Sequence, residues 1–204
     1  MNIHSVYGPI LRYFRQRRVL RFYSVHAVTA ETSVLDLGGS DFFWDLATSL
    51  GLPAPRVTVL NLSAPADVVA DGRKLPFADQ SFDLIFCNSV IEHVGEWPDQ
   101  VATASEIRRV GRSWWVQTPD PRFPIEPHYL GIGVHWLPIT WRRNYGRWFT
   151  LRGWINPAEV RRLPEEVRLL NAARMKELFP GTLLVERFIG CPKSLIASHS
   201  TRSC

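Results

Sequence analysis

Apolar segments of strand length alternate with helical segments along most of the chain, and this alternation constrains the fold more than any other feature. The segments "SVLDLG" (33–38), "RVTVLNL" (56–62) and "FDLIFCN" (82–88) are nearly continuous apolar runs. Such runs are typical of strands buried on both faces of a parallel sheet that helices cover. We therefore expect an α/β fold with a doubly wound sheet.

The final two apolar segments are arranged differently. "GTLLVERFIG" (181–190) and "KSLIASHS" (193–200) follow each other without a helix, so we expect a hairpin in which one strand runs antiparallel to the rest. The other expected elements are a short strand at 66–72, a strand at 113–119, and helices at 41–50, 99–110 and 165–179.

The N-terminal region, residues 1–30, carries arginines without acidic residues. The segment "GPILRYFRQRRVLRFY" (8–23) has apolar residues at spacings of three and four, which predicts a basic amphipathic helix. Two interpretations stay open: a helix packed on the domain edge, or a lid or interfacial helix whose Arg12–Arg21 arginines contact anionic lipid. The remaining domain, 31–204, has equal numbers of acidic and basic residues, so no nucleic-acid binding is expected.

Composition favours a soluble cytoplasmic protein. No apolar run approaches the roughly 20 residues that span a bilayer, and the N-terminus does not read as a secretion signal. Three cysteines without a CxxC pair fit reduced thiols, and we expect no metal site. We expect a cytoplasmic location. If the N-terminal helix is interfacial, we expect the protein to contact a membrane surface peripherally through it.

The interval from Pro119 to Pro164 interrupts the alternation. It holds seven of the 15 prolines and four of the eight tryptophans, and it follows the strand at 113–119. Ligands of open parallel sheets bind beyond the carboxyl ends of the strands, where this interval begins. We therefore interpret 119–164 as a substrate-facing insertion within the domain.

The stretch "SVLDLGGSDFFWDLA" (33–47) predicts a strand, a glycine turn and a helix. Gly38 and Gly39 allow a ligand to approach the backbone closely, and Asp36 places a carboxylate at the same edge. The next strand ends at Asn61, about 20 residues after the turn, where nucleotide-binding sheets place a ribose-binding group. The turn alone is a weak signal, but this spacing favours a cofactor site.

The segment "ADGRKLPFADQSFDLIFCNSVIEHV" (70–94), preceded by "VLDLGG", carries a more specific pattern: D-x-x-x-L-P-F, then F-D, an apolar strand and E-H. Over about residues 30–118 the chain resembles the class I S-adenosylmethionine-dependent methyltransferases of the broad small-molecule type, similar to methyltransferase domain 11. The resemblance implies a Rossmann-like, seven-stranded, mostly parallel sheet with an antiparallel last strand, and S-adenosylmethionine as cofactor.

The resemblance also implies roles for particular residues. They are Asp36, Gly38 and Gly39 around the methionine and ribose, Asn61 at the ribose hydroxyls, Asp71 with Gly72 at the adenine, and Asn88 at the methionine end. Ser40 and Phe42 replace small residues of the family's turn, and Asn61 replaces its acidic ribose ligand. An amide cannot hold both hydroxyls as a carboxylate does, which weakens affinity about tenfold.

Methyl transfer to a hydroxyl needs alignment and a base, and the sulfonium leaving group needs no metal. His128 in "FPIEPHYL" is the leading candidate base, and the other candidates are His93, Glu126, Tyr129 and His135. Each also has a structural interpretation, such as capping or packing. The stripe Trp141, Tyr145, Trp148 and Phe149 predicts either a core under the insertion or a cradle for an apolar acceptor.

These features together predict a methyltransferase acting on an oxygen of a small metabolite, glycan or lipid-linked acceptor. The alternative is a catalytically degenerate methyltransferase-like binding module, which Ser40, Phe42 and Asn61 favour. A nicotinamide-dependent dehydrogenase is disfavoured because the turn lacks G-x-G-x-x-G. The sequence does not indicate an oligomeric state.

Overall fold

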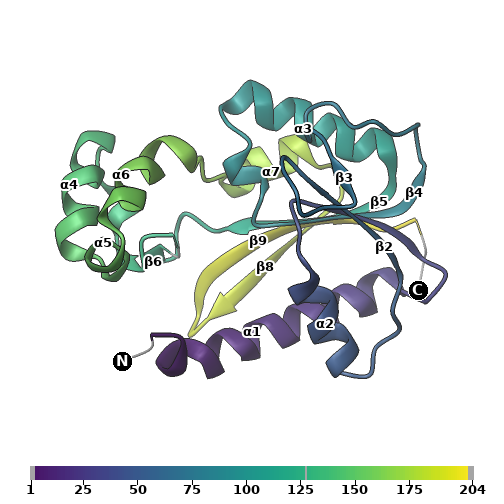
Figure 1. Ribbon diagram of the computed structural model, residues 1–204, viewed down its shortest axis with the longest axis horizontal. Helices are drawn as coiled ribbons and strands as arrows, with labels where there is room; N and C mark the ends of the chain where they lie inside the picture. The colour runs from purple at the N-terminus through teal and green to yellow at the C-terminus, as the bar shows by residue number, and fades with distance from the viewer. Residues whose placement is uncertain (1–2, 127, 202–204) are drawn as a thin grey trace.

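The computed structural model describes residues 3–126 and 128–201, which form a seven-stranded sheet covered by helices on both faces (Figure 1). The strand order is β3-β2-β1-β4-β5-β9-β8. The strands are β1 (Ser33–Leu37), β2 (Arg56–Asn61), β3 (Val68–Val69), β4 (Phe82–Asn88), β5 (Gly111–Pro119), β8 (Thr182–Phe188) and β9 (Cys191–His199). In this sheet β9 runs antiparallel to the other six strands, so the predicted fold class, including the antiparallel last strand, is confirmed.

Two apolar layers stabilise the sheet because successive side chains of a strand point to opposite faces. In β1, Val34 packs in a layer with Phe22 and Trp115, while Leu35 packs in the opposite layer with Ile85. All five of these side chains are fully buried. The continuous apolar runs of the sequence therefore reflect burial on both faces, as expected for a covered parallel sheet.

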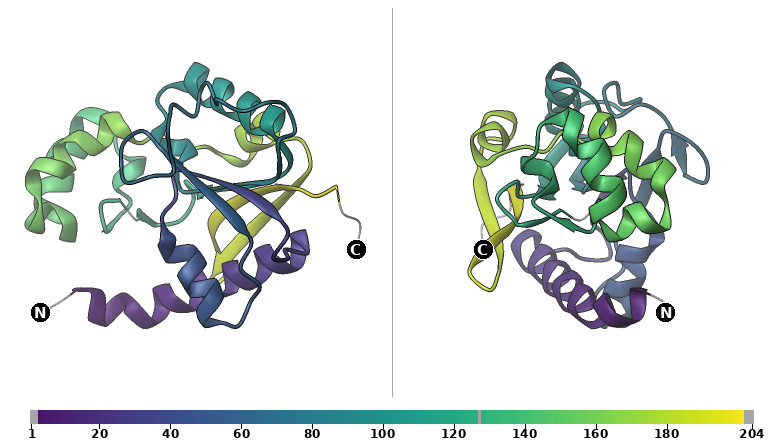
Figure 2. Two further views of the ribbon diagram at one scale, coloured as in Figure 1. Left: turned by 45° about the vertical axis from the view of Figure 1, so that its right-hand side comes forward. Right: turned by 90° about the vertical axis from the view of Figure 1, so that its left-hand side faces the viewer.

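Four helices cover the two faces. Helices α1 (Ile3–His26) and α2 (Asp41–Ser49) lie on one face, and α3 (Trp97–Val110) and α7 (Ala172–Leu178) lie on the other (Figures 1 and 2). The α1 helix packs Phe14, Val19 and Phe22 inward, and Phe22 contacts Phe86 and Trp115 edge to face. This N-terminal helix is thus packed on the sheet; the side chain of Arg12 lies outside the described part.

The insertion forms a separate lobe beyond the carboxyl end of β5 (Figure 1). Its elements are β6 (Ile125–Glu126), β7 (Gly131–Ile132), the 3-10 turn η2 (Val134–Trp136), α4 (Ile139–Phe149), α5 (Leu151–Ile155) and α6 (Pro157–Glu166). A small core that includes Tyr129, Val160 and Leu163 holds it together. Trp141, Trp148 and Phe149 are more than half exposed, so the prediction that this stripe forms a core is wrong for these three residues.

The single helix predicted at 165–179 is also wrong. The α6 helix ends at Glu166 and α7 begins at Ala172, because the intervening backbone bonds elsewhere: Arg168 N donates to Glu92 O at 2.8 Å. The Asn171 side chain then caps α7 by accepting from Arg174 N. Within the part of the chain that the structure describes, no helix is long and apolar enough to cross a membrane.

Candidate active site

The turn after β1 requires glycine at two successive positions, for different reasons. Gly38 has a φ of 71°, in the left-handed region that favours glycine. Gly39 lies directly against Asp36, and a Cβ there would fall 1.9 Å from Asp36 Oδ2. The two glycines therefore let the chain leave the sheet across the Asp36 carboxyl group.

Asp36 is a buried acid that is only partly satisfied. Its side chain accepts a hydrogen bond from Trp44 Nε1 at 2.8 Å through Oδ2. Oδ1 is buried and has no hydrogen-bond partner within residues 3–126 and 128–201. Burial raises the pKa of Asp36 to about 7, against the opposing effect of the Trp44 hydrogen bond.

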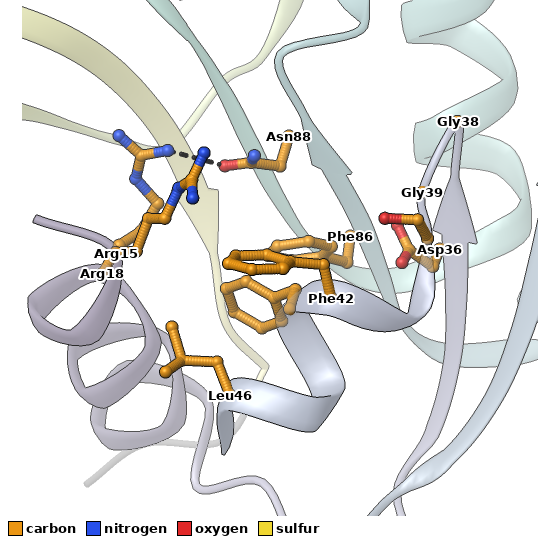
Figure 3. Close-up of a pocket in the computed structure, with 11 residues that line it drawn as sticks. Arg15, Arg18, Asp36, Gly38, Gly39, Phe42, Leu46, Phe86 and Asn88 are labelled. Atoms are coloured by element: carbon orange, nitrogen blue, oxygen red, sulfur yellow. Dashed lines mark hydrogen bonds between the residues drawn. The ribbon is translucent and has the colours of Figure 1, made fainter. Parts of the chain in front are cut away.

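A pocket opens over this turn (Figure 3). Its walls are formed by Arg15, Arg18, Asp36, Gly38, Gly39, Ser40, Phe42, Phe43, Leu46, Phe86 and Asn88. Arg15 and Arg18 come from α1, and the Arg15 guanidinium lies 4.6 Å from the centre of the Phe42 ring. Arg18 donates to Asn88 Oδ1 at 3.0 Å and forms an ion pair with Glu186 at 2.8 Å. The pocket thus has a cationic wall and a buried acid.

A second group of side chains lies past the carboxyl ends of β4 and β5. We call Glu92, His93, Glu126 and His128 the His–Glu cluster; Glu92 and His93 lie on the 3-10 turn η1 (Ile91–His93) that follows β4. His93 Nε2 lies 3.0 Å from His128 Nε2, and His128 Nδ1 lies 2.6 Å from Glu126 Oε1. Thr118 of β5 donates to Glu92 at 3.0 Å.

Charge and burial shift the pKa values of the two histidines of the His–Glu cluster in opposite directions. Burial acts against a charged His128, but the hydrogen bond and negative charge of Glu126 outweigh it, so the pKa of His128 is raised. Partial desolvation of the His93 ring, whose residue is exposed overall, and the neighbouring His128 lower the pKa of His93. Because Glu126 accepts from Nδ1, neutral His128 carries its proton there and leaves a lone pair on Nε2.

Residues 39–113 match the family described as methyltransferase domain. A structure titled as a SAM-dependent methyltransferase from Archaeoglobus fulgidus aligns with a TM-score of 0.55 at 11% identity, covering 92% of this chain and 94% of that one. The N-terminal domain of EvdMO1 with SAH bound aligns with a TM-score of 0.53 at 18% identity, covering 92% and 81%. Residues 39–113 are thus similar to the methyltransferase domain family, and the chain shares the fold of these two structures.

The fold is shared more widely than the matched segment. A structure titled as putative zinc-dependent alcohol dehydrogenases from Rhodobacter sphaeroides aligns with a TM-score of 0.58 at 11% identity, covering 91% of this chain and 89% of that one. At such identities the likeness shows the fold alone. The aligned region spans only about half of the first structures matched, at 56%, 55% and 48% of their chains. No curated protein sequence matches the chain.

The structure places some of the predicted cofactor residues in the pocket and others outside it. Asp36, Gly38, Gly39 and Asn88 line the pocket together. Asn61 adjoins it, because its Nδ2 donates to Gly39 O at 3.1 Å, and this contact leaves Oδ1 as the acceptor.

Asp71 and Gly72 stand apart from the pocket walls. Asp71 pairs with Arg73 at 2.6 Å, and that arginine pairs with Asp99 at 2.8 Å. The hydrogen bonds from Arg73 lower the pKa of Asp71. Gly72 packs on Leu37, where an added Cβ would meet a side-chain carbon at 3.4 Å. An adenine at Asp71 would therefore share the carboxylate with Arg73.

The predicted catalytic residues of the domain separate into two groups. His93, Glu126 and His128 meet in the His–Glu cluster. Tyr129 contributes its backbone N–H, which donates to Glu126 Oε2 at 2.8 Å, while its ring is buried in the lobe core and burial raises its pKa. His135 Nε2 bonds Pro121 O at 2.9 Å, outside the cluster.

Sequence reasoning missed three residues of these sites: Arg15 and Arg18 in the pocket, and Glu92 in the His–Glu cluster. The E-H pair at the end of "NSVIEH" contained the signal for Glu92, since a charged residue directly after a buried strand needs a partner when it is buried. The lid interpretation of residues 8–23 allowed for a cover, but no local signal indicated that Arg15 and Arg18 would lie over the glycine turn.

Proposed function

We propose that this domain binds S-adenosylmethionine in the pocket over Gly38 and Gly39 and methylates an oxygen of its acceptor. The observation that carries the proposal is the buried, unpartnered Oδ1 of Asp36 in a pocket that Arg15 and Arg18 also line. A carboxyl group suits an ammonium, and the Arg15 guanidinium suits a carboxylate, so the pocket offers complementary charge to an amino-acid end; the charge of Arg18 is already paired with Glu186. When bound, the cofactor supplies an activated methyl group on a sulfonium.

The residues of the domain supply alignment and a base. When His128 is neutral, its Nε2 presents a lone pair, and Glu126 at Nδ1 holds the tautomer and stabilises the imidazolium that forms on proton uptake. A positioned base of this kind contributes about 10²–10⁴-fold to a proton-transfer step. His93 lies 3.0 Å from the same nitrogen and occupies the place where an acceptor hydroxyl would enter.

The exposed side chains of the lobe favour a lipid-linked or otherwise apolar acceptor. We call Trp136, Trp141, Trp148, Phe149 and Trp154 the aromatic patch; each is at least 59% exposed. Arg147 lies over Trp148 at 4.8 Å, so cationic and aromatic groups are mixed there. Large exposed patches mark interaction sites, and tryptophan with arginine is typical of membrane interfaces.

The aromatic patch also changes where membrane contact is proposed. The N-terminal helix turns Arg15 over Phe42 and pairs Arg18 with Glu186, so these two arginines serve the pocket rather than a lipid surface. The α4–α5 surface carries the peripheral contact instead in this proposal. The lobe and the N-terminal part of α1 project on the same side of the molecule (Figures 1 and 2).

The alternative is a degenerate methyltransferase-like module that binds without catalysis. Ser40, Phe42 and Asn61 favour it, since Phe42 projects over the pocket and the Asn61 amide already donates to the Gly39 carbonyl.

Calorimetry with S-adenosylhomocysteine on the full chain tests whether the cofactor product binds. We expect saturable binding, and absence of heat at millimolar ligand would overturn the enzyme proposal.

Binding alone does not separate an enzyme from a degenerate module. Incubation with methyl-labelled S-adenosylmethionine and a total metabolite and lipid extract separates them. We expect label to appear in an extract component with wild-type protein and to be strongly reduced with His128→Ala. Binding of S-adenosylhomocysteine without label transfer to any fraction would favour the degenerate module.

A further inference from the structure

Glu92, His93 and His128 converge although they come from two loops. Their candidate ligand atoms all lie within 4.8 Å of one another. The two imidazole Nε2 atoms are 3.0 Å apart. Two nitrogens held about 2.1 Å from one metal ion would be about 3.0 Å apart at a right angle and about 3.4 Å apart at the tetrahedral angle, so the rings are within about 0.4 Å of the spacing of a chelating pair.

The surroundings orient the ligands toward a common point. Glu126 is buried and accepts from His128 Nδ1 at 2.6 Å, which directs the Nε2 lone pair to the opposite side of the ring. Tyr129 N fixes the other oxygen of Glu126 at 2.8 Å, and the ring of His93 interacts with the backbone of Glu166. Carboxylate or carbonyl partners on the far nitrogen are characteristic of metal-binding histidines.

Glu92 supplies an independent indication. Its side chain is fully buried, Thr118 donates to Oε2, and Oε1 has no hydrogen-bond partner in the described chain. A buried carboxylate with an unsatisfied oxygen is costly unless it pairs with a cation. A carboxylate oxygen of Glu92 lies in the same cluster as the two imidazole nitrogens, so one cation would be within reach of all three groups.

We propose that Glu92, His93 and His128 bind a divalent transition-metal ion, with Glu126 as the residue that orients His128. Two imidazoles and one carboxylate suit Zn²⁺ better than Mg²⁺ or Ca²⁺, which prefer oxygen ligands. Three protein ligands leave positions open for water or an acceptor oxygen. His93 is exposed, so the site is accessible from solvent. This proposal departs from the expectation, drawn from the sequence, of no metal.

The role of the ion in catalysis rests on the proposed function, whereas its binding does not. With the ion bound, His128 Nε2 is a ligand and no longer a base. The ion instead polarises an acceptor hydroxyl, whose proton passes to solvent, and the O–C bond forms as the C–S bond of the sulfonium breaks. The acceptor class is then a compound with a hydroxyl able to coordinate a metal.

The test is direct metal binding to the full chain after removal of any affinity tag and dialysis against chelator. We expect one equivalent of Zn²⁺ by elemental analysis. We also expect the protein with Co²⁺ in place of Zn²⁺ to have a visible absorption spectrum that indicates a low coordination number. His128→Ala and Glu92→Gln should each weaken Zn²⁺ affinity at least 100-fold, and Glu126→Gln should weaken it about 10–100-fold. His135→Ala is the matched control and should leave affinity unchanged, because His135 bonds Pro121 O outside the cluster.

Should Glu92→Gln fail to fold, His93→Ala replaces it, since His93 is exposed. Less than one tenth of an equivalent bound by wild-type protein would overturn the proposal, as would Zn²⁺ affinity that His93→Ala and His128→Ala leave unchanged. Calorimetry with S-adenosylhomocysteine on the same samples keeps the two proposals apart. Zn²⁺ bound without S-adenosylhomocysteine binding would contradict the proposed function and leave the metal site standing.

Discussion

Asp36 and Gly39 are matched to each other: the carboxyl group fills the space where any side chain at position 39 would begin, with Oδ2 1.9 Å from an added Cβ. Gly39→Ala must therefore displace either the turn or Asp36. We expect it to weaken S-adenosylhomocysteine binding at least tenfold by calorimetry, and to lower the melting temperature.

Gly51→Ala is the control for that substitution. Gly51 also lies in a turn, with a φ of 73°, and no atom lies within 4 Å of an added Cβ. Its cost should be about 1 kcal/mol of backbone strain, without an effect on ligand affinity. Equal affinities of Gly39→Ala and Gly51→Ala for S-adenosylhomocysteine would contradict the claim that ligand binding depends on the contact between Asp36 and Gly39.

The burial of Asp36 makes stability depend on pH. Its folded pKa of about 7 lies above the ordinary value of 3.8, so the folded state holds a proton that the unfolded state releases. Asp36 therefore stabilises the unliganded protein most below pH 4, and this contribution is lost by about 1.4 kcal/mol per pH unit up to pH 7.

Asp36→Asn removes this dependence because the amide does not ionise. We expect the melting temperature of the variant minus that of the wild type to rise from pH 4 to pH 7. Above pH 7 this difference should stay constant. At pH 8 the same variant should bind S-adenosylhomocysteine more weakly. A melting-temperature difference that is flat with pH would show that Asp36 ionises at its ordinary pKa.

Asp71 and Asp99 share one partner, Arg73, but only Asp71 has a predicted role at the adenine. Each substitution, Asp71→Asn or Asp99→Asn, removes one ion pair with Arg73. We expect about tenfold weaker S-adenosylhomocysteine binding for Asp71→Asn and a change below twofold for Asp99→Asn. Similar losses in both variants would mean that Arg73 positioning, not adenine contact, determines affinity.

The aromatic patch and the N-terminal helix can be separated as lipid-binding surfaces. Trp141→Ser with Trp148→Ser changes two residues that are 65% and 60% exposed, so stability should shift by less than about 1 kcal/mol. We expect this double variant to lose most sedimentation with phosphatidylglycerol vesicles. Arg17→Ala with Arg21→Ala alters exposed residues of α1 and should retain it. Loss of vesicle sedimentation only in the arginine variant would indicate that the N-terminal helix, not the aromatic patch, contacts the membrane.

Local patterns predicted the sheet well because burial on both faces leaves a direct mark on composition. The strands at 33–38 and 82–88 end within one residue of β1 and β4. The break between α6 and α7 near Glu166 was not predicted. It depends on a hydrogen bond from Arg168 N to the carbonyl of Glu92, which is a tertiary contact between distant segments. Periodicity within one segment carries no information about such a partner.

The candidate site was predictable only as far as it is local. The turn at Gly38 and Gly39, and the closeness of Glu126 and His128, follow from neighbouring residues. Asn61 was expected to weaken ribose binding, but its amide donor also holds the Gly39 carbonyl, which an aspartate at that position would repel. The meeting of His93 with His128 depends on two loops from different strands, so only the folded chain reveals it.

A crystal structure with S-adenosylhomocysteine bound tests the central claim most directly. The account predicts that the amino-acid end lies between Asp36 and the Arg15 and Arg18 wall, the ribose beside Asn61, and the sulfur on the side of the His–Glu cluster. A ligand bound elsewhere, or a pocket that stays closed by Phe42 and Arg15 at saturating ligand, would contradict it.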